Sequence, residues 1–121
     1  MEPRIYSVIR LMLSELDRER PLEELAQSVN LSPSRLRHLF KSETGVSPAQ
    51  YLKAHKLEKA RLLLENTFLT LKEIMHQAGF TDRSHFMRDF QKTYGLPPLQ
   101  YRKQFLLAQQ KPQAVVRTAI S

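Results

Sequence analysis

The sequence contains no cysteine among its 121 residues. This absence excludes a disulfide framework, a thiolate metal site and a catalytic thiol, and it fits a reducing cytosol. No apolar run approaches the roughly 18 residues that a membrane-spanning helix requires. The N-terminal stretch MEPRIYS has none of the features of a secretory signal. We therefore expect a cytoplasmic protein.

Signals for catalysis and for metal binding are equally scarce. Four histidines are present, namely His38, His55, His76 and His85. They show no paired metal-ligand spacing with carboxylates. The chain has only three glycines, each explained by a turn of the backbone, and it has neither a phosphate loop nor a nucleophile elbow. We expect no enzymatic activity, no metal and no cofactor.

Two segments of the sequence, residues 30–51 and 78–101, are similar to each other. Six positions recur at a spacing of 50, so that Leu36, Phe40, Gly45, Pro48, Gln50 and Tyr51 return as Phe86, Phe90, Gly95, Pro98, Gln100 and Tyr101. Four upstream positions recur at a spacing of 49, namely Leu22, Glu24, Leu25 and Leu31 as Leu71, Glu73, Ile74 and Phe80. The second copy therefore carries one extra residue in its turn, near Asp82–Arg83. Two copies indicate a duplication rather than a longer repeat array.

Positive charge is concentrated in two blocks that begin inside the two copies. The whole chain has a net charge of +7 and a pI of about 10.0. Residues 35–61 carry 7 basic and 2 acidic side chains, and residues 83–121 carry 7 basic and 1 acidic side chain. Such blocks favour a polyanionic partner. The alternative, a charged surface that is merely solvated, leaves the coincidence with the two copies unexplained.

Each copy predicts a short helix, a tight turn and a second helix. Asn30 stands at the turn of the first copy and Gly79 at the turn of the second. Asparagine and glycine adopt the left-handed backbone conformation most easily, so both indicate a turn between helices. The second helix begins after a residue able to cap it, which is Ser32 in the first copy and Thr81 or Asp82 in the second.

Further helices flank and join the copies. Hydrophobic periodicity predicts an amphipathic helix from Pro3 to Arg20, which Pro21 stops. A connector helix begins at Ser47-Pro48 and reaches Glu65, a length of roughly 27 Å. A last helix begins at Pro97-Pro98, and residues 110–121 show no pattern, so we expect a flexible tail there.

The second helix of each copy has one apolar and one polar face. The outer faces, at i, i+3, i+4 and i+7, comprise Ser34, Arg37, His38 and Lys41 in the first copy and Ser84, Met87, Arg88 and Gln91 in the second, with Arg83 beside the latter. After a tight turn and a short helix, such a face is typical of one that enters the major groove of DNA. The alternative is an ordinary solvated face. The aromatic residues of the copies lie on the core side, so we do not expect them to stack on bases.

Together these features resemble the DNA-binding domain of the AraC/XylS family of bacterial transcription regulators. The resemblance covers residues 5–107, and its most specific part is a signature in the second copy: Gly79-Phe80, Asp82, Ser84, Phe86, Arg88, Phe90, Gly95, Pro98 and Tyr101-Arg102. It implies an all-α fold of seven helices, with helix-turn-helix subdomains over residues 1–47 and 67–109 and a connector helix over residues 48–66. The third and sixth helices are then expected to enter successive major grooves on one side of the duplex.

The resemblance also implies which residues contact DNA. Base contacts are expected from Ser34, Arg37, His38, Arg83, Ser84, Met87 and Arg88. Phosphate contacts are expected from Arg35, Lys41, Ser47, Gln91, Lys92 and Arg102, and from the start of the last helix. Three residues depart from the family pattern. Met75 replaces a small residue under the recognition helix and is expected to tilt or repack the second subdomain. Lys56 replaces an arginine of the connector, and Gln91 replaces a lysine.

The function expected from these observations is sequence-specific binding of double-stranded DNA, at an asymmetric site of about 20 bp with two blocks about 10 bp apart. The resemblance implies activation through RNA polymerase and, in many members, an effector-binding domain for which 121 residues leave no room. The chain is then either a fragment of a longer regulator or a stand-alone regulator. The main competing interpretation is a protein-interaction module that docks acidic partners, which predicts weak, sequence-independent DNA binding and an exposed apolar patch.

Overall fold

The computed structural model describes residues 1–110, so the flexible tail expected over residues 110–121 lies outside the described residues from position 111 onward. Seven helices are present in the described part: α1 (Pro3–Ser14), α2 (Leu22–Gln27), α3 (Pro33–Thr44), α4 (Pro48–Asn66), α5 (Leu71–Ala78), α6 (Arg83–Tyr94) and α7 (Pro98–Gln109). No strand occurs between residues 1 and 110. The all-α fold predicted from the sequence is therefore confirmed.

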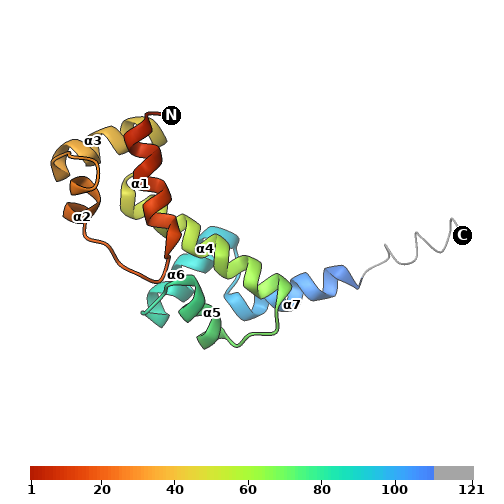
Figure 1. Ribbon diagram of the computed structural model, residues 1–121. Coiled ribbons are helices and arrows are strands. Elements are labelled where there is room, and N and C mark those ends of the chain that lie inside the picture. The colour runs from red at the N-terminus through yellow and green to blue at the C-terminus, as the bar shows by residue number, and fades with distance from the viewer. Residues whose placement is uncertain (111–121) are drawn as a thin grey trace, which may run out of the picture.

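The helices form two groups along α4, as Figure 1 shows. Helices α1, α2 and α3 lie around the N-terminal end of α4, and α5, α6 and α7 lie along its C-terminal part. The core of the first group consists of Ile5, Val8, Ile9, Met12, Leu25, Ala26, Leu36 and Phe40. The core of the second group consists of Leu57, Ala60, Leu64, Leu71, Ile74, Met75, Ala78, Phe86 and Phe90. Because each group has its own core, we refer to α1–α3 as the first subdomain and to α5–α7 as the second.

Helix α1 is shorter than the sequence predicted. It ends at Ser14 and not at Arg20, and Glu15 has an extended backbone (φ −143°, ψ 91°). The Arg20 side chain turns back instead and donates from Nη1 to the carbonyl of Leu11 at 2.9 Å. A cation on the last carbonyls of a helix satisfies an acceptor and complements the helix dipole. The prediction was wrong because the apolar spacing of Leu16 continued the helical pattern, although Leu16 already belongs to a loop.

Both helix-turn-helix turns have the backbone predicted for them. Asn30 has a φ of 57° and Gly79 a φ of 90°, so both lie in the left-handed region. The helix after each turn is capped by a side chain. Ser32 accepts from the N–H of Arg35 at 3.1 Å, and Asp82 accepts from the N–H of His85 at 2.9 Å. Asp82, and not Thr81, is therefore the cap of α6.

The second subdomain is built around aromatic rings. Phe86 and Phe90 are fully buried, and Phe90 meets Tyr101 edge to face at a centroid distance of 5.6 Å. The sequence-based placement of these rings on the core side is confirmed. Met75 is also buried in this core, at 8% exposure. The idea that Met75 tilts the subdomain stays a prediction.

Candidate nucleic-acid interface

The outer face of α3 is polar and open to solvent. Its inner face is anchored by Leu36 and Phe40, both with no exposed surface, so the opposite side of the helix must face outward. All four predicted residues of this face are exposed: Ser34, Arg37, His38 and Lys41. Together with Ser42 they line a shallow depression on the protein surface. The structure thus brings the first predicted reading surface together on a single helix.

The outer face of α6 is less uniform. Phe86 and Phe90 anchor its inner side, and the exposed residues are Arg83, Ser84, Arg88 and Gln91. Met87 is only half exposed because part of its side chain packs against the second core. The sequence placed Met87 on the outer face, and the structure shows that its side chain is shared between core and surface. Arg88 is 67% exposed, and its Nε lies 3.8 Å from Asp89 Oδ1.

Most residues expected to contact phosphates are open to solvent. Arg35, Lys41, Gln91 and Lys92 are all exposed. Ser47 is half-buried, and its Oγ accepts from the N–H of Gln50 at 3.2 Å while Gln50 Oε1 accepts from the N–H of Ser47 at 3.1 Å. This capping box uses the backbone N–H of Ser47. The hydroxyl proton of Ser47 is therefore the donor left for an anion.

The start of α7 differs from the start of α4. Pro97 precedes α7 and supplies no side-chain cap. The backbone N–H groups in the first turn of a helix have no partners inside the helix, and they attract anions. The first turn of α7 therefore leaves its backbone N–H donors open to an anion. In α4 the capping box occupies some of the equivalent donors.

Arg102 makes hydrogen bonds inside the protein that the sequence did not suggest. Its guanidinium donates to three carbonyls beyond and within the end of α4, namely those of Leu64 at 3.0 Å, Thr67 at 3.2 Å and Leu69 at 2.8 Å. The side chain is half-buried and holds α7 against the loop that follows α4. These bonds give Arg102 a structural role, and its expected phosphate contact stays a prediction. The sequence could not reveal this, because the three acceptors are backbone carbonyls more than 30 positions away.

A second polar cluster fixes the same two helices. Tyr101 donates from its hydroxyl to Glu65 Oε2, and Arg61 Nη1 donates to the same oxygen at 2.8 Å. Burial raises the pKa of Tyr101, and the hydrogen bond to Glu65 raises it further. These residues join α4 to α7 and take no part in either outer face.

Other kinds of site find no support in the described residues. Within residues 1–110, no group of three or more His, Asp or Glu side chains is arranged to hold a metal ion. No helix of this part of the chain combines the length and the apolar character needed to cross a membrane.

Known proteins share both the sequence pattern and the fold. A family model described as "Helix-turn-helix domain" matches residues 25–104. The regulator GbdR of Pseudomonas aeruginosa is 32% identical over 102 residues, which are 84% of this chain and 28% of that protein. The arabinose operon regulatory protein of Escherichia coli is 32% identical over 103 residues, which are 84% of this chain and 35% of that protein. The chain belongs to the AraC-type helix-turn-helix family.

Solved structures of this family have the same architecture. The C-terminal domain of the response regulator AraT from Geobacillus stearothermophilus is 30% identical, with a TM-score of 0.79 over 85% of this chain and 86% of that one. The DNA-binding domain of AdpA, solved in complex with a target DNA, has a TM-score of 0.82 over 89% of this chain and 97% of that one at 24% identity, which shows the fold. This AraC-type chain spans about a third of the curated relatives' length.

Proposed function

We propose that the chain binds double-stranded DNA sequence-specifically as part of a transcription regulator, with α3 and α6 in successive major grooves of an asymmetric site of about 20 bp. The observation that carries this proposal is the pair of exposed polar helix faces on one chain, each behind a tight turn and both attached to α4. Because the two faces differ in sequence, the two blocks of the site differ as well. One chain engages both grooves without a dimer.

Base recognition is assigned chiefly to Arg37 and Arg88. Both are exposed, and a guanidinium can bind the O6 and N7 of guanine through two parallel hydrogen bonds. The neighbouring polar residues are Ser34, His38, Arg83 and Ser84. Met87 contributes only the exposed part of its side chain, which suits apolar contact with a thymine methyl group.

Phosphate binding is assigned to residues at the edges of the two faces. They are Arg35, Lys41, Ser47, Gln91 and Lys92, joined by the backbone donors at the start of α7. Arg102 can contribute only through the N–H groups that remain, because three of its five donors are used inside the protein.

Selection of bound duplexes from a random DNA library at moderate salt tests the proposal. Two enriched blocks about one helical turn apart are expected. A single block would restrict base reading to one subdomain. No enrichment, together with binding that disappears as salt rises, would contradict the proposal and favour an acidic protein partner.

We further propose that the regulator acts in the cytoplasm as an activator that contacts RNA polymerase. A relative named as the transcriptional activator RhaR of Mannheimia succiniciproducens supports the activating role, at 29% identity over 103 residues. The chain spans only part of its relatives, which supports a separate effector-binding domain in a longer regulator. A reporter gene behind the selected site tests the sign of regulation, since repression on expression of the chain would contradict activation.

A further inference from the structure

The two subdomains are joined at a second place besides α4. The loop between α1 and α2, residues 15–21, crosses to the turn of the second helix-turn-helix. A methyl group placed on Gly79 would lie 2.3 Å from the carbonyl oxygen of Leu16, 2.8 Å from its carbonyl carbon and 3.2 Å from the Cα of Asp17. The backbone of the first subdomain therefore rests directly on the turn that precedes α6.

This contact is specific to Gly79. Gly45 and Gly95 have nearly the same backbone conformation, with φ of 85° and 88°, yet a methyl group on either meets nothing within 4 Å. The left-handed conformation alone accounts for a glycine at those two positions. At Gly79 the space next to the backbone is also filled, and it is filled by the other subdomain.

Arg20 holds the α1–α2 loop to the first subdomain. Its side chain is only 7% exposed, and besides the Leu11 carbonyl it faces Glu24 Oε2 at 3.4 Å and Glu15 Oε1 at 4.0 Å. That Glu24 oxygen is buried and makes no hydrogen bond in the described residues, so Arg20 supplies the charge opposite it. The loop is thus fixed at one end by Arg20 and touches the second subdomain at Leu16.

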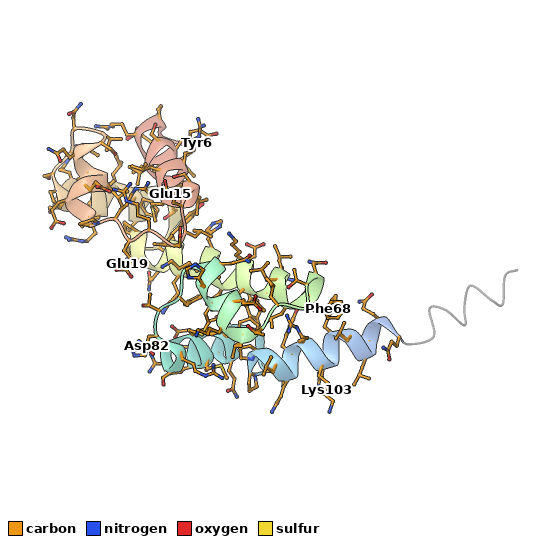
Figure 2. All side chains as sticks on the ribbon, turned by 60° about the horizontal axis from the view of Figure 1, so that its bottom comes forward. Tyr6, Glu15, Glu19, Phe68, Asp82 and Lys103 are labelled. Atoms are coloured by element: carbon orange, nitrogen blue, oxygen red, sulfur yellow. The ribbon has the colours of Figure 1, made fainter. Side chains whose placement is uncertain are left out.

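An ion pair beside this junction joins α4 to α6. Lys53 Nζ lies 3.5 Å from Asp89 Oδ2, and Asp89 is the neighbour of Arg88 on α6. Glu19, Lys53, Gly79 and Asp89 border one crevice between the subdomains. Figure 2 shows Glu19 at the junction of the two groups of helices, on the same side of the molecule as Asp82.

We infer that the α1–α2 loop fixes the orientation of α6 relative to α3 and thereby sets the spacer length between the two blocks of the DNA site. This inference rests on the proposed function. Two bodies joined by one helix can twist about its axis, whereas a second contact away from that axis removes this freedom. One added base pair rotates the second block by about 36°, since a turn of DNA has about 10 bp. A locked pair of subdomains therefore accepts a narrow range of spacers.

The test measures affinity for duplexes that carry both selected blocks and differ only in spacer length. For the unaltered chain we expect about tenfold weaker binding when the spacer changes by one base pair, comparable with a mismatched base pair. Gly79→Ala forces the loop away, so its affinity should change less than about threefold across the same spacers. Gly95→Ala is the matched control, because it introduces the same backbone strain without the clash, and it should keep the narrow spacing. Equal spacing profiles for Gly79→Ala and the unaltered chain would overturn the inference.

Arg20→Gln is a second test variant, and it leaves the second subdomain unchanged. If Gly79→Ala does not fold, Arg20→Gln alone tests the inference. It frees the loop and should broaden the accepted spacers. Arg18→Gln removes the same charge from the same loop and also loses a contact to Glu24, at 3.3 Å, but its side chain is 53% exposed and makes no bond to α1. This control should keep the narrow range of spacers. If Arg20→Gln keeps the narrow profile, the loop does not set the spacing.

A measurement without DNA separates failure of the inference from failure of the proposed function. Because the chain has no cysteine, spin labels attached through Ser42→Cys on α3 and Thr93→Cys on α6 report the distance between subdomains without removal of native thiols. Gly79→Ala and Arg20→Gln should broaden this distance distribution, and Gly95→Ala should not. An unchanged distribution overturns the inference even where both blocks are bound. If the unaltered chain selects no paired blocks, the proposed function fails and the spacing inference falls with it.

Discussion

The first subdomain buries aliphatic side chains of α1 around a single ring, Phe40, whereas the second buries two rings, Phe86 and Phe90, against α4 and α5. The two nevertheless place equivalent helices behind equivalent turns. Asn30 and Gly79 share the left-handed backbone, and Gly45 and Gly95 end α3 and α6 in the same way. The positions that fix the backbone path are therefore retained in both copies, while the chemistry of the core and of the outer face differs.

Removing one buried ring from each core tests whether the two cores are independent. Phe40→Ala and Phe90→Ala each remove a fully buried ring, and each should lower the free energy of unfolding by about 3–5 kcal/mol. If the subdomains unfold separately, amide hydrogen exchange should accelerate only in the subdomain that carries the substitution. Equal acceleration across both subdomains would show instead that they unfold as one unit.

The next effect concerns the tyrosines at equivalent positions. Tyr101 donates to Glu65, whereas Tyr51 packs on Phe40 at a centroid distance of 5.4 Å and has no carboxylate partner within residues 1–110. Tyr101→Phe should therefore cost about 1.5–3 kcal/mol, as for other hydrogen bonds to charged groups, while Tyr51→Phe should cost little. Denaturant unfolding of the two variants measures the difference. Similar costs would remove the distinction between the copies.

The same tyrosine should give the second subdomain a response to alkali. Burial and Glu65 raise the pKa of Tyr101 above its ordinary value of 10.0. Its contribution to stability is then fully present below that value and is lost as the pH rises through the folded-state pKa. Unfolding experiments between pH 8 and 11 should show this loss in the unaltered chain and not in Tyr101→Phe.

DNA selection with variants of Arg37 and Arg88 distinguishes the base preferences of the two outer faces. Arg37→Ala should relax the base preference of one block and Arg88→Ala that of the other, each at a cost of about 1–3 kcal/mol for the preferred sequence. The two selected motifs, compared with that of the unaltered chain, reveal which block each arginine reads. Uniform weakening on all sequences would identify the substituted residue as a phosphate contact.

Acid titration should distinguish the N-terminal caps of α3 and α6. The N–H of His85, bonded to the Asp82 carboxylate, lowers the pKa of Asp82 below its ordinary value of 3.8. The stabilisation from this cap is present above that value and is lost as the pH falls through the folded-state pKa. The cap of α3 is Ser32, which does not titrate. The protection of the His85 amide, relative to its intrinsic exchange rate at each pH, should therefore fall in acid while that of the Arg35 amide does not, and Asp82→Ser should abolish the difference.

The sequence predicted the elements whose signals are local. Turn residues, caps and the apolar faces of α3 and α6 depend on neighbours a few positions away, so the seven helices and the exposed outer faces followed from periodicity and from the resemblance. Pro48 and Pro98 marked helix starts for the same reason, since proline suits the first helical position.

Features that depend on distant parts of the chain could not be predicted. The end of α1 is capped by the distant side chain of Arg20, which the apolar pattern ignores. Arg102 binds backbone carbonyls, which every residue has, so no sequence signal identifies its partners. The approach of Leu16 to Gly79 has the same character, because Gly79 was already explained by the conformation of its turn.

The position of Arg102 also bears on how the protein forms during its synthesis. The core of the first subdomain is complete once the chain has reached Tyr51 and Leu52, so this subdomain can fold while the remainder is still being translated. The second subdomain lacks its tie between α7 and the carbonyls of Leu64 and Leu69 until Arg102 has left the ribosome. We therefore expect the two halves of this duplicated protein to fold in the order in which they are made.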